Sequence, residues 1–272
     1  MLSGVVDLDG NVLAHDRCDT PASGVWDALA SLVARVQAAA SAHELIACGV
    51  GCGGPMSNQG EKVSNLHIKE WNDFPLRSSL ATLTGLPTFV DNDAKAVVLG
   101  ETWCGAAVAH RNVIGMVVST GVGGGIICDG KLLDGDTGNA GHIGHVNVVP
   151  NGRECKCGAR GCLEGVASGT AIAAMTGRPA AQATPEIITQ TGTYVGRAVA
   201  SVATLLDLRL AVIGGSVALG FGAPFYAAAQ AEVDRCARIK FARGIQVLPT
   251  GLGADAPLVG AAAVARHYGG LR

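Results

Sequence analysis

Three cysteines lie close together in the segment Cys155-Lys-Cys157-Gly-Ala-Arg-Gly-Cys162, and His145 precedes them by ten residues. Zinc prefers four tetrahedral nitrogen or sulfur ligands, and closed structural sites commonly use three cysteines and one histidine. The glycines between the second and third cysteine let the backbone curl so that the thiols converge. The spacing therefore predicts a structural zinc ion bound by His145, Cys155, Cys157 and Cys162.

The alternative for these cysteines is a set of free thiols or a redox pair. The C-x-C spacing differs from the C-x-x-C of thioredoxin-type sites, and neither alternative explains the third cysteine and the histidine. The chain has nine cysteines, an odd number for a disulfide framework. The other six are scattered, mostly beside apolar residues, and are interpreted as small buried hydrophobic residues.

Residues that could bind a ligand flank the cysteine segment on both sides. Gly141-His142-Ile143-Gly144-His145 lies upstream, and Glu164 follows Cys162 by two residues. A metal cross-link here would fix His142, His145 and Glu164 relative to one another. Such stiff support is what a binding pocket needs.

Two glycine-rich segments could bind phosphate. Ser119–Gly125 lies between two predicted strands. Its glycines have no β-carbon, so their backbone N–H groups can approach an anion closely, and Thr120 adds a hydroxyl donor. This segment is neither a GxxxxGK[ST] loop nor a GxGxxG helix start, and a tight turn explains it as well. Gly214-Gly215-Ser216 follows a predicted strand, so it is either a nucleotide contact or an ordinary strand-to-helix turn.

Asp93 lies where a predicted strand meets a predicted helix, in Val90-Asp91-Asn92-Asp93-Ala94-Lys95. A carboxylate there could take the proton from a hydroxyl that attacks a phosphoryl group, and Asn92 could hold that hydroxyl. The alternative is that Asp91 or Asp93 only caps the helix. The local pattern fits both roles.

The elements that must position these residues alternate between strand, glycine turn and helix, which indicates a two-lobed α/β protein. Asp9-Gly10 predicts a hairpin near the start. Strands are expected over residues 45–52, 87–90, 113–119, 124–133 and 210–213. Helices are expected over residues 25–42, 94–103, 170–175, 186–206, 225–238 and 258–267.

Composition excludes several classes of function. The chain has 272 residues, of which 49% are hydrophobic and 15% charged, and its net charge is −2. Without a basic face, nucleic acid is not expected as a partner. No run of 18 apolar residues predicts a membrane span, and the first ten residues do not resemble a secretory signal. A cytoplasmic protein is therefore expected.

Taken together, the motifs resemble the ROK family of sugar kinases and related repressors, within the hexokinase and actin-like ATPase superfamily. The resemblance rests on Val90–Ala94, Ser119–Gly125, Gly138–His145, Cys155–Glu164 and Gly214–Ser216. It implies an α/β fold with two actin-like, ribonuclease H-like lobes, a cleft between them and a structural zinc loop. The small lobe would cover residues 1–93, with the C-terminal helix at about 258–272 packed back on it, and the large lobe residues 94–257.

The resemblance also implies roles for residues. Asp93 would be the general base that deprotonates the 6-hydroxyl of a sugar for attack on the γ-phosphate of ATP. The sugar would be held by Asn65, Asn92, His145 and Glu164. Thr120, Gly121 and Gly123 would contact phosphate, Gly214 and Gly215 the adenosine, and Mg²⁺ would accompany ATP. The family implies a dimer or tetramer, and polyphosphate stays open as an alternative donor.

His142 is a first departure from the family pattern, because glucokinase-type members usually have Glu at this position. A histidine there resembles the bacterial N-acetylmannosamine kinases. His142 is therefore expected either to bind the sugar or to line the pocket wall without contact. The expected substrate is a hexose or N-acetylhexosamine, with glucose or N-acetylmannosamine foremost.

A second departure concerns the start of the chain. Family members begin with a strand and a D-x-G-G-T phosphate loop, and Met1-Leu2-Ser3 stands where that loop would just have ended. About ten residues are expected to be missing, so the first sheet would lack a strand. The alternatives are a misplaced start site or a catalytically weak sugar-binding protein. A sugar-responsive regulator would need a helix-turn-helix, for which the sequence leaves no room before Asp7.

Overall fold

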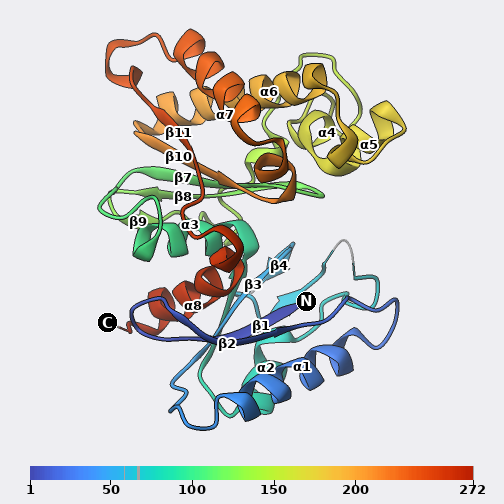
Figure 1. The fold of residues 1–272 in the computed structure, drawn as a ribbon, viewed down its shortest axis with the longest axis vertical. Helices are drawn as coiled ribbons and strands as arrows, with labels where there is room; N and C mark the ends of the chain where they lie inside the picture. The colour runs from blue at the N-terminus through green and yellow to red at the C-terminus, as the bar shows by residue number, and fades with distance from the viewer. Residues whose placement is uncertain (58, 66–67, 272) are drawn as a thin grey trace. The chain divides into compact units, whose positions relative to one another are not determined.

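A computed structural model describes residues 1–57, 59–65 and 68–271. The chain forms two compact units (Figure 1). Unit 1 consists of Met1–Gly105, Asp134–Ala140 and Leu252–Arg272, and unit 2 of Ala106–Leu133 and Gly141–Gly251. The division therefore falls after Gly105, twelve residues beyond the boundary expected from the sequence.

The strands of unit 1 form three pairs. The hairpin β1 (Leu2–Val6) and β2 (Val12–Arg17) is antiparallel, and it contains the predicted Asp9-Gly10 turn. Asp7 holds this turn, because its Oδ1 accepts from the backbone N–H groups of Asp9 and Asn11 at 2.9 and 2.8 Å. β3 (Cys48–Cys52) and β6 (Thr88–Asn92) are parallel, and β4 (Met56–Ser57) pairs antiparallel with β5 (Lys62–Val63).

Unit 1 contains the helices α1 (Val25–Ala39), α2 (Leu76–Thr84), α3 (Asp93–Cys104) and α8 (Ala256–Gly269). Helices α3 and α8 cross where both lack a side chain. A β-carbon added at Gly100 would lie 3.1 Å from the Cα of Gly260. This close packing explains why α3 belongs to unit 1 with the C-terminal helix, and why the boundary at residue 93 differs from the structure.

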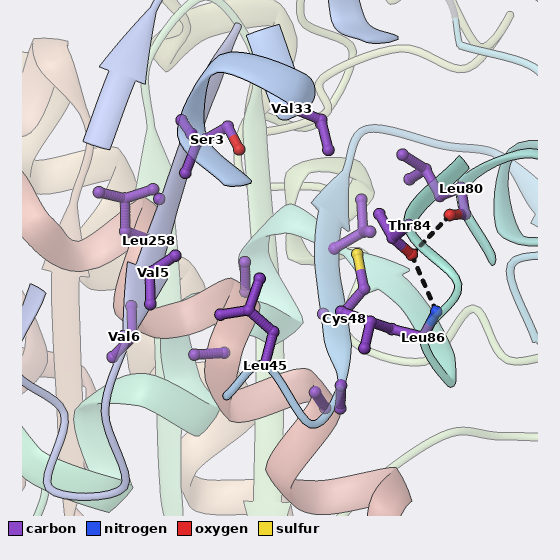
Figure 2. A pocket seen from close by; sticks show the side chains of 18 of the residues that line it. Ser3, Val5, Val6, Val33, Leu45, Cys48, Leu80, Thr84, Leu86 and Leu258 are labelled. Carbon is purple, nitrogen blue, oxygen red and sulfur yellow. Dashed lines mark hydrogen bonds between the residues drawn. The ribbon is translucent and has the colours of Figure 1, made fainter. Parts of the chain in front are cut away.

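A cavity of about 670 Å³ lies in unit 1 (Figure 2). Its lining includes β1 on one side and Leu45–Cys52 on the other, and the side chains are largely aliphatic, as Val5, Val33 and Leu258 illustrate. β1 and β3 belong to separate two-stranded sheets. The cavity is therefore lined by strands of two sheets that are not hydrogen-bonded to each other. The expectation that the first sheet lacks one strand stays a prediction.

Unit 2 is built on a five-stranded sheet with the order β11-β10-β7-β8-β9. Its strands are β7 (Val113–Val118), β8 (Val122–Cys128), β9 (Lys131–Leu132), β10 (Leu210–Gly214) and β11 (Gln246–Pro249). β10 runs parallel to both β7 and β11, whereas β7 and β8 form an antiparallel hairpin. β10 is buried along its whole length, which matches the unbroken apolar run expected of a central parallel strand.

The helices of unit 2 are α4 (Glu164–Ala167), α5 (Gly169–Thr176), α6 (Pro185–Leu206) and α7 (Ser216–Cys236). α7 has a break at Gly222, whose φ of 61° is not helical, and Pro224 follows it. The predicted helix over 225–238 corresponds to the part after this break. In the described residues, no helix combines the length and the apolar character that crossing a bilayer requires.

Glu232 is a buried carboxylate that forms ion pairs with two partly exposed arginines and joins α6 to α7. Glu232 is 6% exposed, and its carboxylate accepts from the Nε of Arg235 at 2.7 Å and from the Nε of Arg197 at 3.0 Å. Hydrogen bonding to Arg235, with a smaller contribution from Arg197, lowers the pKa of Glu232 from 4.5 to about 2. The pair therefore favours the folded state above pH 4.5, and this contribution is lost as the pH falls toward 2.

Glu232→Gln is expected to lower the free energy of unfolding at pH 7 by up to about 3 kcal/mol. It should also flatten the dependence of stability on pH between about 5 and 2. Urea unfolding measured across this range checks the prediction, with Glu44→Gln at an exposed position as the control. Parallel stability curves for wild type and Glu232→Gln below pH 5 would contradict it.

Candidate active site and metal centre

Asp93 lies at the carboxyl end of strand β6, at the first position of helix α3. Asn92 caps this helix, because its Oδ1 accepts from the N–H of Ala94 at 2.9 Å, and an Oδ1 of Asp93 accepts from the same N–H at 2.9 Å. The cap is therefore Asn92, and the alternative that Asp91 or Asp93 caps the helix is wrong, because Asp93 is already the first residue of α3. A carboxylate has two oxygens, so the contact with the N–H of Ala94 does not exclude a chemical role for Asp93.

Asn65 lies at the same end of the parallel pair. Its Nδ2 donates to the carbonyl of Gly53 at 3.0 Å and lies 3.8 Å from the Sγ of Cys52, which is directly opposite Asn92 in the strand register. Burial raises the pKa of the Cys52 thiol to about 11, and the charge of Asp93 adds to this rise. The structure therefore brings Asn65, Asn92 and Asp93 together in unit 1.

The four predicted zinc ligands converge in unit 2. Their ligand atoms all lie within 4.8 Å of one another, with the Nδ1 of His145 3.8 Å from the Sγ of Cys155 and the thiols of Cys157 and Cys162 3.7 Å apart. A tetrahedral zinc ion with bonds of about 2.3 Å places its sulfur ligands roughly 3.8 Å apart. This Cys₃His cluster therefore fits a zinc ion in both donor chemistry and size.

The backbone around the cluster forms tight turns. The N–H of Cys155 donates to the carbonyl of Ala159 at 2.7 Å, and Gly158 and Gly161 have positive φ values of 88° and 80°. Burial raises the pKa of the Cys162 thiol to about 12, whereas a hydrogen bond from the backbone of Ala159 lowers the pKa of Cys157. Zinc binds thiolates, so metal loading of this cluster would release protons.

Glu164 begins helix α4 and connects the cluster to the β7–β8 hairpin. Its Oε2 accepts from the N–H of Val122 at 3.0 Å. A β-carbon added at Gly121 would lie 2.8 Å from that oxygen, so a side chain at this position would displace the Glu164 carboxylate. The rings of His142 and His145 are nearly parallel, at 13°, with centroids 6.3 Å apart.

The predicted phosphate contacts lie at two adjacent turns of unit 2. The N–H of Ser119 donates to the carbonyl of Gly121 at 2.9 Å, which closes the β7–β8 turn around Thr120. The hydroxyls of Ser119 and Ser216 lie 2.9 Å apart, so this turn contacts the start of helix α7, just after Gly215. Gly214 is the last residue of β10.

The strand expected over residues 124–133 begins two residues earlier than predicted, so the glycine-rich segment Ser119–Gly125 is a turn only as far as Gly121. Strand β8 begins at Val122, and Gly123 lies within it, opposite Val117 of β7. The three consecutive glycines are strand residues because β7 offers a full ladder of pairing partners. Gly123 therefore lies in the sheet and not in the turn.

Two residues close to Asp93 were not predicted from the sequence. Lys95 and Tyr268 both contact the carboxylate of Asp91, although Tyr268 is far away in the sequence. The one local indication of this network was the spacing of Asp91 and Lys95, because opposite charges four positions apart often form an ion pair.

Comparisons with known proteins agree with this geometry. The profile of the ROK family matches residues 2–268. The glucokinase of Streptomyces coelicolor is 40% identical over 186 residues, which cover 68% of this chain and 57% of that protein. The N-acetylmannosamine kinase of Salmonella arizonae is 41% identical over 164 residues, which cover 55% of this chain and 56% of that protein. The chain thus spans somewhat more than half the length of these relatives.

Among solved structures, the chain is similar to a ROK family glucokinase from Streptomyces griseus in complex with glucose and AMPPNP. The TM-score is 0.83 at 31% identity, and the match covers 97% of this chain and 95% of that one. The fold is thus that of the ROK sugar kinases, which is actin-like and mixed α/β, as expected from the motifs. The match of the family profile to nearly the whole sequence leads to one conclusion: the chain belongs to the ROK family.

Proposed function

We propose that the protein is an ATP-dependent kinase that phosphorylates the 6-hydroxyl of a hexose or N-acetylhexosamine. The observation that carries the proposal is the position of Asp93 at the end of β6, beside Asn92 and Asn65. A carboxylate flanked by amide groups suits a hydroxyl that must be both held and deprotonated. The family to which the chain belongs supports the same reaction.

In the proposed reaction, Asp93 accepts the proton of the sugar 6-hydroxyl as that oxygen attacks the γ-phosphorus. A new oxygen–phosphorus bond forms, the bond to the bridging oxygen of ATP breaks, and ADP leaves. The sugar hydroxyls are bound by Asn65, Asn92, His142, His145 and Glu164. Mg²⁺ bound with ATP supplies neutralisation of the phosphate charge.

The nucleotide is proposed to bind at the two adjacent turns of unit 2. Thr120 and Gly121 offer a hydroxyl and backbone N–H groups at the hairpin turn, and Gly123 follows in the sheet. Gly214 ends the central strand β10 and Gly215 precedes α7, which is the kind of strand end where α/β sheets bind nucleotides. We propose phosphate contacts for Thr120, Gly121 and Gly123 and adenosine contacts for Gly214 and Gly215.

We also propose that the Cys₃His cluster holds zinc as a structural ion. The ion would fix His145 directly and Glu164 through the two-residue spacing from Cys162. His145 would then serve both as a zinc ligand and at the sugar. Stiff support of this kind is typical of metal sites that position neighbouring side chains.

A coupled assay of ADP release tests the proposed function. Purified protein is mixed with Mg-ATP and, in separate reactions, glucose, N-acetylmannosamine or N-acetylglucosamine. Turnover is expected with glucose or N-acetylmannosamine, and the preference between the two reports on His142. Replacing ATP with polyphosphate identifies the phosphate donor. Sugar binding without turnover for any donor would contradict the kinase and favour a sugar-binding protein.

A further inference from the structure

Lys95 is a charged side chain in a place that disfavours it. It is 1% exposed and lies in the first turn of helix α3, two residues after Asp93. The amino end of a helix carries partial positive charge, so a cation there is unfavourable. Burial of an unpaired ammonium group would also raise the free energy of the folded state by a large amount. Lys95 is therefore tolerated only because its surroundings compensate for both effects.

The compensation comes from three oxygens of unit 1. The Nζ of Lys95 lies 2.6 Å from the Oδ1 of Asp134, 2.9 Å from the carbonyl of Gly138 and 3.5 Å from the Oδ1 of Asp91. An ammonium group has three donors, so these three acceptors match its capacity. Lys95 thus fastens the segment 134–140 to the end of strand β6.

Tyr268, on helix α8, contacts the same carboxylates. Its hydroxyl lies 2.7 Å from the Oδ2 of Asp91 and 3.2 Å from the Oδ1 of Asp134. A hydroxyl has one hydrogen, which the shorter distance assigns to Asp91. Burial, together with the neighbouring Asp91, raises the pKa of Tyr268, so the hydroxyl keeps its proton at neutral pH.

Asp91 transmits these contacts to the residues of the proposed site. It is 4% exposed, and its Oδ1 accepts from the N–H of Asn92 at 2.7 Å while Tyr268 and Lys95 hold the carboxylate. The Asp91–Asn92 peptide leads directly into the backbone that carries the side chains of Asn92 and Asp93. A fixed Asp91 therefore restrains the backbone from which both side chains extend.

We propose that Lys95 and Tyr268 are positioning residues for phosphoryl transfer: they immobilise the Asp91 carboxylate, which orients the peptide of Asn92 and thereby the Asp93 carboxylate. The inference rests on the proposed kinase function, in which Asp93 is the base. Neither residue touches the substrate in this proposal, so each acts on the rate through Asp93.

Tyr268→Phe is the sharpest test, because it removes the hydroxyl and keeps the ring. We expect kcat to fall by about 10- to 100-fold, because misplacing a reacting group by about 1 Å can lower a reaction rate by roughly 100-fold. The KM for ATP should change less than about twofold, because the proposed nucleotide contacts belong to unit 2. Tyr194→Phe, at a tyrosine of helix α6 whose ring faces Arg197, is the matched control and should leave both constants unchanged.

A double mutant separates positioning from general loss of structure. If Tyr268 acts through Asp93, then Tyr268→Phe should lower the residual rate of an Asp93→Ala enzyme by less than about twofold. An equal loss in both backgrounds, or wild-type kcat in Tyr268→Phe, would overturn the inference and leave the kinase function standing. Absence of turnover in the wild-type protein would overturn both.

Lys95→Met provides a second variant with an apolar chain of similar length. We expect the same pattern as for Tyr268→Phe, with a fall in kcat and an unchanged KM for ATP. Because two carboxylates then lose their cation, this variant is compared only if its circular dichroism spectrum matches that of the wild type. If it does not fold, the measurements on Tyr268→Phe decide the inference alone.

Discussion

Replacing Asp93 with alanine is expected to lower kcat by about 10³-fold or more, while the dissociation constant for the sugar changes less than about threefold. Proton abstraction by a positioned base contributes roughly 10²- to 10⁴-fold to a rate. The other proposed sugar contacts, including Asn65 and Glu164, stay in place. Sugar binding is measured by isothermal titration calorimetry, and turnover by the coupled assay of ADP release.

The backbone contact of Asp93 and its proposed role as a base can be separated with Asp93→Asn. Its amide oxygen can still accept from the N–H of Ala94, as the Oδ1 of Asp93 does at 2.9 Å, but the amide cannot take a proton from the sugar. Stability should therefore stay near that of the wild type while kcat falls as in Asp93→Ala. Asp9→Asn, at the exposed tip of the first hairpin, is the control. Unchanged turnover in Asp93→Asn would reject the assignment of the base.

The local pattern of the sequence predicted the elements on which the proposed site depends. The short run that ends at Val90 and the three polar residues that follow it predicted both strand β6 and the start of α3. The division into units depends on contacts between distant segments, which local periodicity does not contain. The close packing of Gly100 against Gly260 is such a contact, and it places α3 in unit 1. Helix α2 was missed because its nine residues offer few repeats of the helical pattern.

In the candidate site too, contacts between residues that are close in the sequence could be predicted, whereas contacts between distant residues could not. The four ligands of the Cys₃His cluster lie within eighteen residues, so their spacing alone predicted that they converge. The network around Asp91 joins strand β6, the segment 134–140 and helix α8, with Tyr268 lying 177 positions from Asp91. Nothing in the sequence near Lys95 indicates that it is buried. Its partners explain the burial, and they become visible only in the fold.

Zinc removal is the second large effect that we expect. Chelation should weaken sugar binding at least about tenfold before the protein unfolds. Removing the outer contacts that support a metal site typically lowers metal affinity or activity 10- to 100-fold, and we expect an effect of similar size on the sugar. The reason is local: the cluster includes His145, and Glu164 follows Cys162 by two residues at the start of α4. Sugar affinity by calorimetry, zinc content by mass spectrometry and helix content by circular dichroism are followed in the same titration with chelator.

Variants distinguish the cluster from the other thiols. Cys162→Ser, at a buried ligand, is expected to purify with less than one equivalent of zinc and to bind sugar as weakly as the chelated protein. Cys236→Ser should retain both zinc and sugar affinity, because this cysteine at the end of α7 is not a ligand; it is exposed, so its interpretation as a buried hydrophobic residue is wrong. A chelated protein that is free of zinc yet binds sugar with unchanged affinity would show that the ion does not brace His145 and Glu164. Stoichiometric zinc in Cys162→Ser would show that this thiol is not a ligand, because a tetrahedral site that loses one of four ligands should bind the ion far more weakly.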